Sequence, residues 1–519
     1  MNTAELLDTQ EGADKWQRLA PAAIIHFAVQ FVVVFVKQVI QGLLPIIAIV
    51  FTAGENRWLI ISLIAIGSAA LLLIAAVLSY LKFRFRLSGD TFLIQKGVFK
   101  RKRLSLGYNR IQNVSFAQPI YFRPFNLIVL GIESAGSSSK EVNLSGIPRA
   151  LAEEIRATVF KSHAAAKSGT EAADTAMTGE TALPAEEQTI ISQPISELVR
   201  YGLSNSGIWV YAGLLGAAAS QLQQAEIDFI SFPFIENLFV ELKAYSNFVA
   251  FIVTVFSAAI VIFTVVIFLS VTGSIIVNYK YHLTWGNRRF HRTRGLFERQ
   301  EMSLPENKVQ SLVINQGWPA RLVDRFHLQL KQVGFGNIPG QPGQGNANKF
   351  LVPSVTEDFL QGFSNILYPD FQWSDLKLNP IDKSFTKKAV LWIILPISIL
   401  PTIGLTIGVG FLGLLPLLAA PLSAPIIMRV RSQYGYATDG RHGVFRSGFI
   451  GHKLTVFSFY KVQTVAVMQT PGQRRRGLAT LEIKMAGSTT EIPYMPLTDA
   501  NRWRDSILYE IESSDKSWM

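Results

Sequence analysis

The chain has 519 residues, and 49% of them are hydrophobic, which is too apolar for an ordinary soluble protein. It contains no cysteine, so disulfide bonds, thiolate metal sites and cysteine nucleophiles are excluded. Its formal net charge is +12, with 49 Lys and Arg against 37 Asp and Glu. The composition predicts a mixture of membrane spans and soluble domains.

The N-terminal region is a polar segment followed by two long apolar runs. Residues 1–21 contain no short apolar core with a small-residue cleavage site, so we expect no cleaved signal peptide. The run 22–53 exceeds the ~20 residues that cross a bilayer but is interrupted by polar residues such as Lys37. It therefore either crosses as a tilted or bent helix or lies partly in the interface. Residues 58–80 are uncharged and complete a predicted transmembrane pair at 22–80.

Soluble segments and further apolar pairs alternate along the rest of the chain. Residues 161–192 are rich in Ala, Thr and Glu and nearly free of large apolar residues, which predicts a flexible linker. Two later apolar stretches are each long enough for two crossings. The predicted order is a cytoplasmic N-terminus 1–21, transmembrane pair 22–80, β domain 81–160, linker 161–192, transmembrane pair 203–277, β domain 278–367, transmembrane pair 389–428 and β domain 432–515.

The β domains contain an internal repeat of forty residues without gaps, at 97–136, 295–334 and 448–487. Each copy opens and closes on a glycine, and carries two Gln, one Arg and one basic residue at fixed distances from the opening glycine. Such a repeat indicates three copies of one structural unit. These repeat-signature residues are Gly97, Arg110, Gln112, Gln118 and Arg123 in the first copy, Gly295, Lys308, Gln310, Gln316 and Arg321 in the second, and Gly448, Lys461, Gln463, Gln469 and Arg474 in the third.

The pattern inside the repeat is that of β-strands. Apolar residues alternate with polar ones, as at Leu130 and Ile132, which indicates half-buried antiparallel strands. The opening glycine suits a turn that needs a positive φ. A helix is predicted after each copy, at 148–160, 356–366 and 499–511. Each unit is therefore about 80 residues of strands closed by one helix.

The charges beside the spans predict the orientation in the membrane. Each pair of spans returns the chain to the side that it left, so both termini and all three β domains share one side. The loop 226–247 carries four acidic residues against one lysine, whereas Lys82, Lys280 and Arg429 lie beside the spans on the β side. Because Lys and Arg are enriched in cytoplasmic segments, the β side is predicted to be the cytoplasm.

The chain resembles the bacterial PH-domain membrane proteins of the YdbT type, whose domains belong to the second bacterial PH class (DUF304-like). The resemblance covers about 80 to 515 and rests on the paired spans, the strand glycine and the pattern Arg/Lys-Ile/Val-Gln at 110–112, 308–310 and 461–463. It implies a multi-pass α-helical membrane protein with three repeated α+β domains, each a PH-like, partly open β barrel with a C-terminal helix. It also implies a bacterial cytoplasmic (inner) membrane location, no catalytic residues, and a complex with a smaller one-domain PH-like membrane protein relative.

No motif points to catalysis, a metal or a cofactor. None of the seven His belongs to an HExxH pattern or a pair at ligand spacing, so we expect no metal site. Gly408, Gly410 and Gly413 match the dinucleotide fingerprint but lie in an uncharged membrane run with no acidic residue after it, where helix packing explains them better. We therefore predict no cofactor and no enzymatic activity.

Three basic clusters are candidate contact surfaces. The alternatives are general attraction to an anionic membrane surface, a specific lipid pocket, and charge that only sets topology. The first cluster follows a strand turn, where eukaryotic PH domains hold inositol phosphates, which is an analogy of fold alone. Nucleic acid is not expected as a partner, because the clusters lie beside a bilayer and lack interleaved aromatics. The clusters are Lys100, Arg101, Lys102 and Arg103; Arg288 and Arg289 with Arg292 and Arg294; and Arg474, Arg475 and Arg476.

The repeat-signature residues are predicted to be mainly structural. The three Arg are expected to bind turn carbonyls or a carboxylate, with ligand binding as the alternative, and the Gln to satisfy backbone groups. We predict an inner-membrane scaffold or binding protein that presents three cytoplasmic PH-like domains to protein partners and membrane lipids. The alternative is a component of an envelope-defence or export-associated complex in which the spans carry the function.

Overall fold

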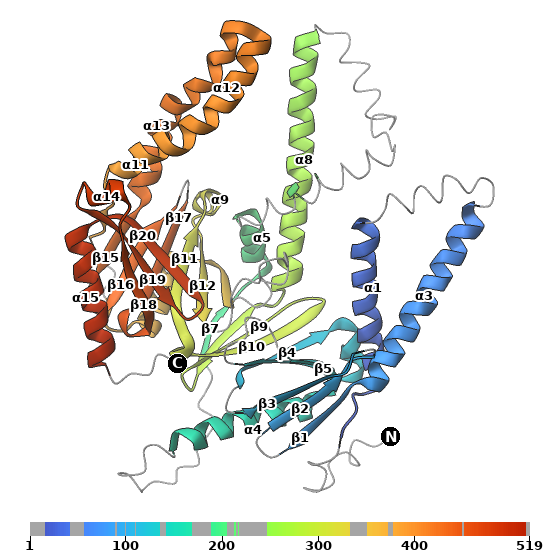
Figure 1. Cartoon of the computed structure of the whole chain (residues 1–519). Helices are drawn as coiled ribbons and strands as arrows, with labels where there is room; N and C mark the ends of the chain where they lie inside the picture. The colour runs from blue at the N-terminus through green and yellow to red at the C-terminus, as the bar shows by residue number, and fades with distance from the viewer. Residues whose placement is uncertain are drawn as a thin grey trace. The chain divides into compact units, whose positions relative to one another are not determined.

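The computed structural model describes residues 16–41, 57–88, 91–98, 100–108, 111–134, 142–168, 188–204, 212–213, 216, 247–332, 350–371, 377–448 and 451–514. These residues form two compact units, each described by itself below. Unit 1 comprises Met1–Gln193 with Gly207–Ser303, and unit 2 comprises Pro194–Ser206 with Leu304–Met519. The ribbon is shown in Figure 1.

Unit 1 contains long helices and ten strands among its described residues. The helices are α1 (Ala23–Gln41), α3 (Arg57–Lys82), the 3₁₀ helix η5 (Ile120–Phe125), α4 (Arg149–Ser168) and α8 (Asn247–Asn278). The strands are β1 (Arg84–Ser88), β2 (Thr91–Lys96), β3 (Lys102–Gly107), β4 (Ile111–Pro119), β5 (Leu127–Ser134), β6 (Val142–Pro148), β7 (Gln188–Ser192), β8 (His282–Gly286), β9 (Arg289–Arg294) and β10 (Glu298–Pro305), whose last two residues belong to unit 2.

Unit 2 has the same kinds of element. Its helical segments are α5 (Ile195–Ser204), η7 (Glu306–Lys308), α9 (Trp318–Leu322), α10 (Glu357–Leu367), α11 (Ser384–Ala389), η8 (Val390–Ile394), α12 (Leu395–Val409), η9 (Gly410–Leu418), α13 (Ala419–Gln433), η10 (Phe459–Lys461), α14 (Pro471–Arg474) and α15 (Leu497–Ser513). Its strands are β11 (Val309–Gln316), β12 (Phe326–Gln332), β13 (Phe350–Val355), β14 (Asn379–Pro380), β15 (Gly435–Thr438), β16 (His442–Ser447), β17 (His452–Ser458), β18 (Val462–Met468), β19 (Leu478–Met485) and β20 (Ser488–Pro496).

Within the described residues, four helical segments are long and apolar enough to cross a membrane: Ser62–Lys82, Val255–Asn278, Ser384–Gly408 and Gly413–Gln433. The first two occupy α3 and α8, and the last two form the hairpin of α11 to α13 (Figure 1). A shorter apolar helix lies in α1. Residues 42–53 of the predicted run 22–53, and nearly all residues from 205 to 246 in the predicted pair 203–277, lie outside the described residues, so six crossings remain a prediction.

The sheets join consecutive repeats instead of closing within each one. In unit 1 a seven-stranded sheet has the order β6-β5-β4-β10-β9-β8-β7, and in unit 2 another has the order β13-β12-β11-β17-β16-β15-β14. Three-stranded sheets, β1-β2-β3 and β18-β19-β20, contain the first strands of the first repeat and the last strands of the third. The second half of one repeat therefore pairs with the first half of the next. We call the β4–β10 pairing join 1 and the β11–β17 pairing join 2.

Both joins use the same register. Arg299 lies opposite Gln118 in join 1, and His452 lies opposite Gln316 in join 2. Each pair combines the fourth residue after one repeat's opening glycine with the second signature Gln of the preceding repeat. Because a slip of one residue would turn every side chain to the other face of the sheet, this shared register shows that the two joins are one kind of contact.

The opening glycines make a turn that a side chain would block. Gly97, Gly295 and Gly448 have φ of 110°, 114° and 151°. A Cβ at these positions would lie 2.1, 2.0 and 1.9 Å from the carbonyl oxygen three residues later. Only glycine tolerates both the positive φ and this close approach, which explains why the repeat begins on it.

The alternating apolar residues form the cores, as their period predicts. In unit 1, Leu130 and Ile132 of β5 are fully buried and belong to a cluster that includes Ile155 of α4. In unit 2, Leu481 of β19 packs in a cluster with Trp503 of α15. The helices after the first and third repeats thus pack on the strands of their units. The partly open β barrel expected for each domain stays a prediction, since the sheets join consecutive repeats.

A short segment before each pair of spans also joins the sheets, which the sequence reading missed. Gln17 bridges to Phe85 of β1, β7 pairs with β8, and β14 pairs with β15. The predicted linker 161–192 is correspondingly shorter, since α4 continues to Ser168 and Gln188–Ser192 form β7. Composition hides β7 because only two of its five residues are large and apolar.

Candidate interaction surfaces at the repeat joins

The signature Arg of the first repeat reaches across join 1. Arg123 lies in η5, and its Nη2 donates a hydrogen bond to the carbonyl oxygen of Leu296 at 2.6 Å. Leu296 directly follows the opening glycine of the second repeat. A guanidinium with several fixed donors suits such carbonyl binding. The turn carbonyl expected from the sequence therefore belongs to the neighbouring repeat.

A bidentate ion pair supports the same join. Nη1 and Nη2 of Arg149, the first residue of α4, bind the two carboxylate oxygens of Glu301 in β10 at 3.1 and 2.9 Å. Glu301 is only 7% exposed, so the charge-assisted bonds compensate a carboxylate that is largely removed from water. Arg149 also binds Glu153, one turn further along α4, at 2.9 Å.

Join 2 is held by the signature basic residue of the third repeat. Lys461 is buried, and its Nζ donates to the carbonyl oxygens of Asn307, at 3.2 Å, and Val309. Burial lowers the pKa of Lys461 to about 8, because the charged ammonium loses its water. The equivalent Lys308 is half-buried, and Arg110 lies outside the described residues.

The signature Arg of the second repeat lies in a basic environment at join 2. Arg321 is in α9, and together with Arg446 and Arg429 it acts electrostatically on His452 of β17. Burial and then the repulsion from these three guanidinium groups lower the pKa of His452 to about 4. His452 is therefore neutral at physiological pH, and join 2 tolerates several positive charges close together.

The signature Gln residues have two different roles. The second Gln binds within its own repeat, since Nε2 of Gln118 donates to Leu127 O at 3.3 Å and that of Gln469 to Leu478 O at 2.8 Å. The burial of the first Gln depends on whether its strand takes part in a join. Gln310 in β11 is fully buried, whereas Gln463 in β18 is exposed. The side chain of Gln112 lies outside the described residues.

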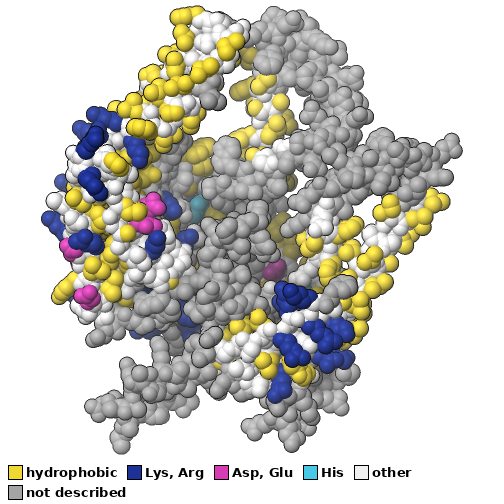
Figure 2. Space-filling view, viewed as in Figure 1, with side chains coloured by type: hydrophobic (Ala, Val, Ile, Leu, Met, Phe, Trp, Pro, Cys, Tyr) yellow, Lys and Arg dark blue, Asp and Glu magenta, His cyan; other side chains and the backbone are white. Residues whose placement is uncertain are grey.

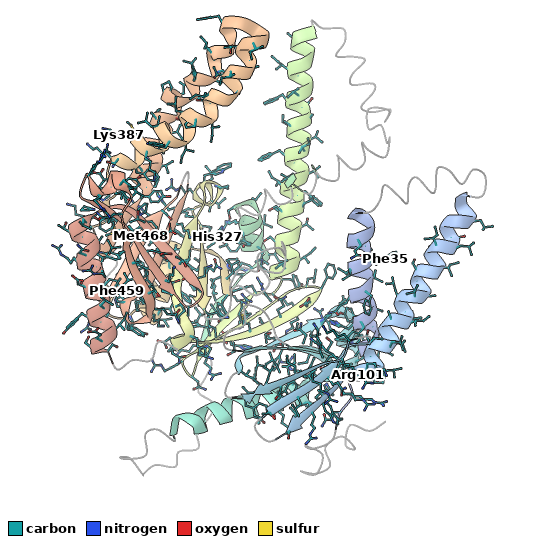
Figure 3. The ribbon with its side chains drawn as sticks, viewed as in Figure 1. Phe35, Arg101, His327, Lys387, Phe459 and Met468 are labelled. Carbon is teal, nitrogen blue, oxygen red and sulfur yellow. The ribbon has the colours of Figure 1, made fainter. Side chains whose placement is uncertain are left out.

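The first basic cluster is exposed and lies on the edge of the three-stranded sheet of unit 1. Lys100, Arg101, Lys102 and Arg103 are all exposed, with the last two in β3. Figure 2 shows Lys and Arg side chains gathered over this sheet, and Figure 3 labels Arg101 on it. These four residues are free to meet an anionic surface.

The second cluster is split between surface and interior. Arg288 is exposed and Arg289 half-buried, at the turn between β8 and β9. Arg292 and Arg294 are buried, and Nη1 of Arg294 donates to Asn278 Oδ1, at the end of α8, at 3.1 Å. This last contact ties the sheet to the membrane-facing helix, so these two arginines belong to the interior of unit 1.

The third cluster follows the third repeat's signature Arg. Arg474, Arg475 and Arg476 are exposed at the end of α14. Nη1 of Arg476 donates to Ser384 Oγ, at the start of α11, at 2.7 Å. Arg123 in unit 1 bonds to the next repeat, whereas the side chain of Arg474 is exposed.

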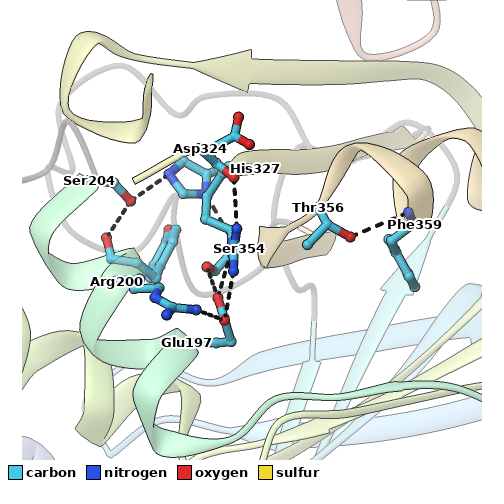
Figure 4. A network of polar contacts seen from close by, with 10 residues as sticks. Glu197, Arg200, Ser204, Asp324, His327, Ser354, Thr356 and Phe359 are labelled. Atoms are coloured by element: carbon cyan, nitrogen blue, oxygen red, sulfur yellow. Dashed lines mark hydrogen bonds and ion pairs between the residues drawn. The ribbon is translucent and has the colours of Figure 1, made fainter. Parts of the chain in front are cut away.

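A buried polar network, which the sequence reading did not find, anchors α5 in unit 2 (Figure 4). Glu197 accepts hydrogen bonds from Arg325 at 3.0 and 3.2 Å and from Ser354 Oγ at 2.6 Å, and also pairs with Arg200. Burial opposes its ionisation, but the bonds from Arg325 and Ser354 outweigh burial and lower the pKa of Glu197 to about 2. The carboxylate thus fixes the segment that precedes the second pair of spans.

A neutral histidine completes this network. Nδ1 of His327 accepts from the backbone N–H of Ser354 at 3.3 Å, and Nε2 lies 3.1 Å from Ser204 Oγ. Burial lowers the pKa of His327 to about 4, so Nε2 carries the proton and donates it to Ser204. No local motif could show the contacts of His327 with Ser204 and of Arg325 with Glu197, because these partners are more than 120 residues apart in the chain.

We expect Glu197→Gln to lower the free energy of unfolding by about 2 kcal/mol, because Arg325 and Ser354 would lose a charged hydrogen-bond partner in a half-buried site. Since the pKa of Glu197 is lowered, its contribution is complete above about pH 4.5 and is lost as pH falls toward 2. Thermal unfolding of the full chain in detergent measures both effects. Glu153→Gln removes an exposed pair and should change stability by less than about 0.5 kcal/mol. Equal shifts for the two variants would contradict the assignment.

A cleft beside β15 carries charged residues that compensate one another. Tyr436 donates to Asp499 at 2.8 Å, Arg502 lies 3.9 Å from the same carboxylate, and His442 binds Asp439 at 2.9 Å. Because these groups are paired within the cleft, we assign it no ligand. Among the described residues, no group of three His, Asp or Glu could hold a metal ion.

Comparisons with known proteins agree with the triple repeat. The family described as "Bacterial PH domain" matches residues 31–163, 237–351 and 393–511. The chain is also similar to the UPF0699 transmembrane protein YdbT of Bacillus subtilis (strain 168), with 22% identity over 487 residues that cover 91% of this chain and 93% of that relative. Each family match extends from a predicted membrane pair into the β region that follows it.

Proposed function

The chain belongs to the bacterial PH domain family and is a membrane protein, and on this basis we propose that it is a non-catalytic scaffold whose repeats contact anionic lipid headgroups and protein partners. It acts as a multi-pass protein of the bacterial inner membrane, with both termini and all β repeats on the cytoplasmic side. Support for this orientation comes from Lys82, in the last turn of α3, and from Arg84 and Arg86 in the strand that follows.

The observation that carries the proposal is the exposed basic cluster of the first repeat. Lys100, Arg101, Lys102 and Arg103 share one strand edge and are all exposed. Juxtamembrane Lys and Arg gain roughly 1 kcal/mol each from an anionic leaflet. By contrast, the buried Arg292 and Arg294 cannot reach a headgroup.

A protein partner fits the same scaffold. The smaller one-domain PH-like membrane protein suggested by the family resemblance would carry one such repeat. The joins support this pairing, because repeats of this family bind one another edge to edge within this chain.

Replacing residues 100–103 by alanine should weaken binding of phosphatidylglycerol by the full chain at least about tenfold at low salt. The difference should shrink as salt rises, since the screening length falls to about 8 Å at physiological ionic strength. The measurement is a titration of delipidated protein in neutral detergent with short-chain phosphatidylglycerol and, in parallel, phosphatidylcholine.

The matched control replaces two arginines of α15, the exposed Arg502 and the half-buried Arg504, and should leave binding unchanged. An equal loss in both variants would mean that only net charge matters. No preference of the native chain for phosphatidylglycerol would refute the lipid role and leave protein partners as the contact.

A further inference from the structure

Among the described residues, two strands at positions equivalent to those that form the joins pair with a neighbour on one side only and leave the other edge open. β3 pairs with β2 alone, and β18 pairs with β19 alone. Their counterparts in the other repeats have neighbours on both sides: β10 and β17 correspond to β3, and β4 and β11 correspond to β18. The first repeat, through β3, and the third repeat, through β18, therefore each carry one half of the contact that forms joins 1 and 2.

The exposure of β18 shows what a missing neighbour leaves uncovered. The first six residues of β11 are buried, whereas in β18 only Val462 is. Ser311 and Gln310 are fully buried in join 2, but the equivalent Thr464 and Gln463 are exposed. The open edge thus exposes positions that the joins bury.

Strand β18 also lacks the usual protection of an edge. Its sequence, Val-Gln-Thr-Val-Ala-Val-Met, contains no charge, no proline and no glycine. Exposed edges of this kind template the addition of another strand, and proteins normally blunt them with Lys or Pro. β3, in contrast, begins with Lys102 and Arg103.

We infer that β18 of one copy pairs with β3 of a second copy, in the register of the internal joins. In the first repeat, the fourth residue after the opening glycine is Arg101, which directly precedes β3. Arg101 would lie opposite Gln469. Lys102 then lies opposite Met468, and Arg103 opposite Val467. Figure 3 labels Arg101 and Met468, which mark the two edges. The second copy is the occupant because the chain itself carries both halves of the contact.

Such a contact joins different surfaces of the two copies and leaves a new open edge at each end. Head-to-tail contacts of this kind produce a ring if the rotation closes and a filament if it does not. Because every copy is held in the same membrane, the assembly would grow within the membrane plane and present a row of repeats.

The charges at the contact make the assembly dependent on counter-ions. By analogy with Arg123 and Leu296 in join 1, Arg474 would approach the carbonyl of Val98 in the second copy. This brings the cluster at 474–476 close to the cluster at 100–103. Join 2 already accommodates Arg321 and Arg446 near His452, so the fold tolerates this crowding. Anionic headgroups or added salt should favour assembly, because either reduces the repulsion.

Cysteine cross-linking tests the register, since the native chain has no cysteine. Two differently tagged full-length copies, one with Lys102→Cys and the other with Met468→Cys, are co-expressed and oxidised in native membranes. We expect a dimer that carries both tags, at a yield at least about fivefold above that of Lys102→Cys with Tyr509→Cys, an exposed site on α15. Arg103→Cys with Val467→Cys tests the adjacent pair. It is needed because opposite residues in antiparallel strands alternate between hydrogen-bonded and non-hydrogen-bonded pairs, which differ in their Cα separation.

The positive control is Asn315→Cys with Lys453→Cys in one chain, which occupies the same two positions in join 2 and should form a disulfide within the chain. If this control closes and neither edge pair gives the mixed dimer, the inference is wrong. A single chain carrying Lys102→Cys and Met468→Cys that closes on itself would equally overturn it, as would cross-linking of Met468→Cys to a different protein in place of a second copy.

Charge reversal provides an independent readout. Arg475→Glu with Arg476→Glu should raise the yield of the mixed dimer about threefold to tenfold at low salt, because repulsion by the cluster at 100–103 becomes attraction. Reversal of Arg502 and Arg504 is the matched control and should have no effect. An unchanged or lower yield for the first pair would contradict the proposed contact.

Discussion

Ser311→Lys should lower the free energy of unfolding of unit 2 by about 4 kcal/mol or more, the largest effect of a single substitution that we expect. Ser311 is fully buried in join 2, opposite Phe457 of the third repeat and Lys331 of its own repeat. A lysine there would bury an ammonium opposite the lysine at position 331.

The matched substitution is Thr464→Lys, at the same position of the third repeat. Thr464 is exposed on the open edge of β18, and it also lies opposite a lysine, Lys484. We expect it to cost less than about 1 kcal/mol. Thermal unfolding of both variants in detergent, at a concentration where the chain is monomeric, measures the difference. Similar costs would show that join 2 does not exclude water.

The second large effect concerns truncation. Fragment 1–303 should persist in membranes with a half-life at least about tenfold longer than that of fragment 1–193. Both contain the first pair of apolar runs and the first repeat, but only the longer one contains β8, β9 and most of β10. In the shorter fragment β4 loses β10 and keeps only β5, and β7 loses β8. Pulse-chase labelling measures the two half-lives.

A point variant separates the effect of losing join 1 from the effect of fragment length. Gly295→Val in fragment 1–303 places a branched side chain where a Cβ would lie 2.0 Å from the carbonyl oxygen of Glu298. It should therefore shorten the half-life toward that of fragment 1–193. Equal half-lives for all three fragments would mean that the first repeat is stable without its neighbour.

Features that depend on local physics could be predicted from the sequence. The opening glycines imply a turn with positive φ, and the period of two predicts the buried faces of strands such as β5 and β19. The uncharged runs predict α3, α8 and the hairpin of α11 to α13 because membrane spans are selected by length and apolarity alone. The bacterial PH family was likewise identifiable from the signature residues and is confirmed by the comparisons.

Features that depend on pairing between distant segments could not be predicted. The backbone edge of a strand offers the same donors and acceptors to a partner from its own repeat or from the next one, so periodicity does not reveal the joins. The sequence identifies Lys461 only as a repeated basic residue. Its bonds to the carbonyl oxygens of Asn307 and Val309, which connect two repeats across join 2, depend on the fold. The Glu197 network was hidden for the same reason, since its partners Arg325 and Ser354 come from another part of the chain.

The joins also impose an order on biosynthesis. The edge of β4 that β10 covers is complete once Pro119 has left the ribosome, but its partner Glu298 follows about 180 residues later. At a synthesis rate of ~5–20 residues per second, that edge of β4 stays unpaired for roughly 10–40 s. During this time the second pair of apolar runs must be inserted, because it lies between the two strands. Maturation of the first repeat is therefore coupled to insertion of the apolar region that precedes the second repeat. A delay in this insertion would leave the edge of β4 without β10 and open to aggregation.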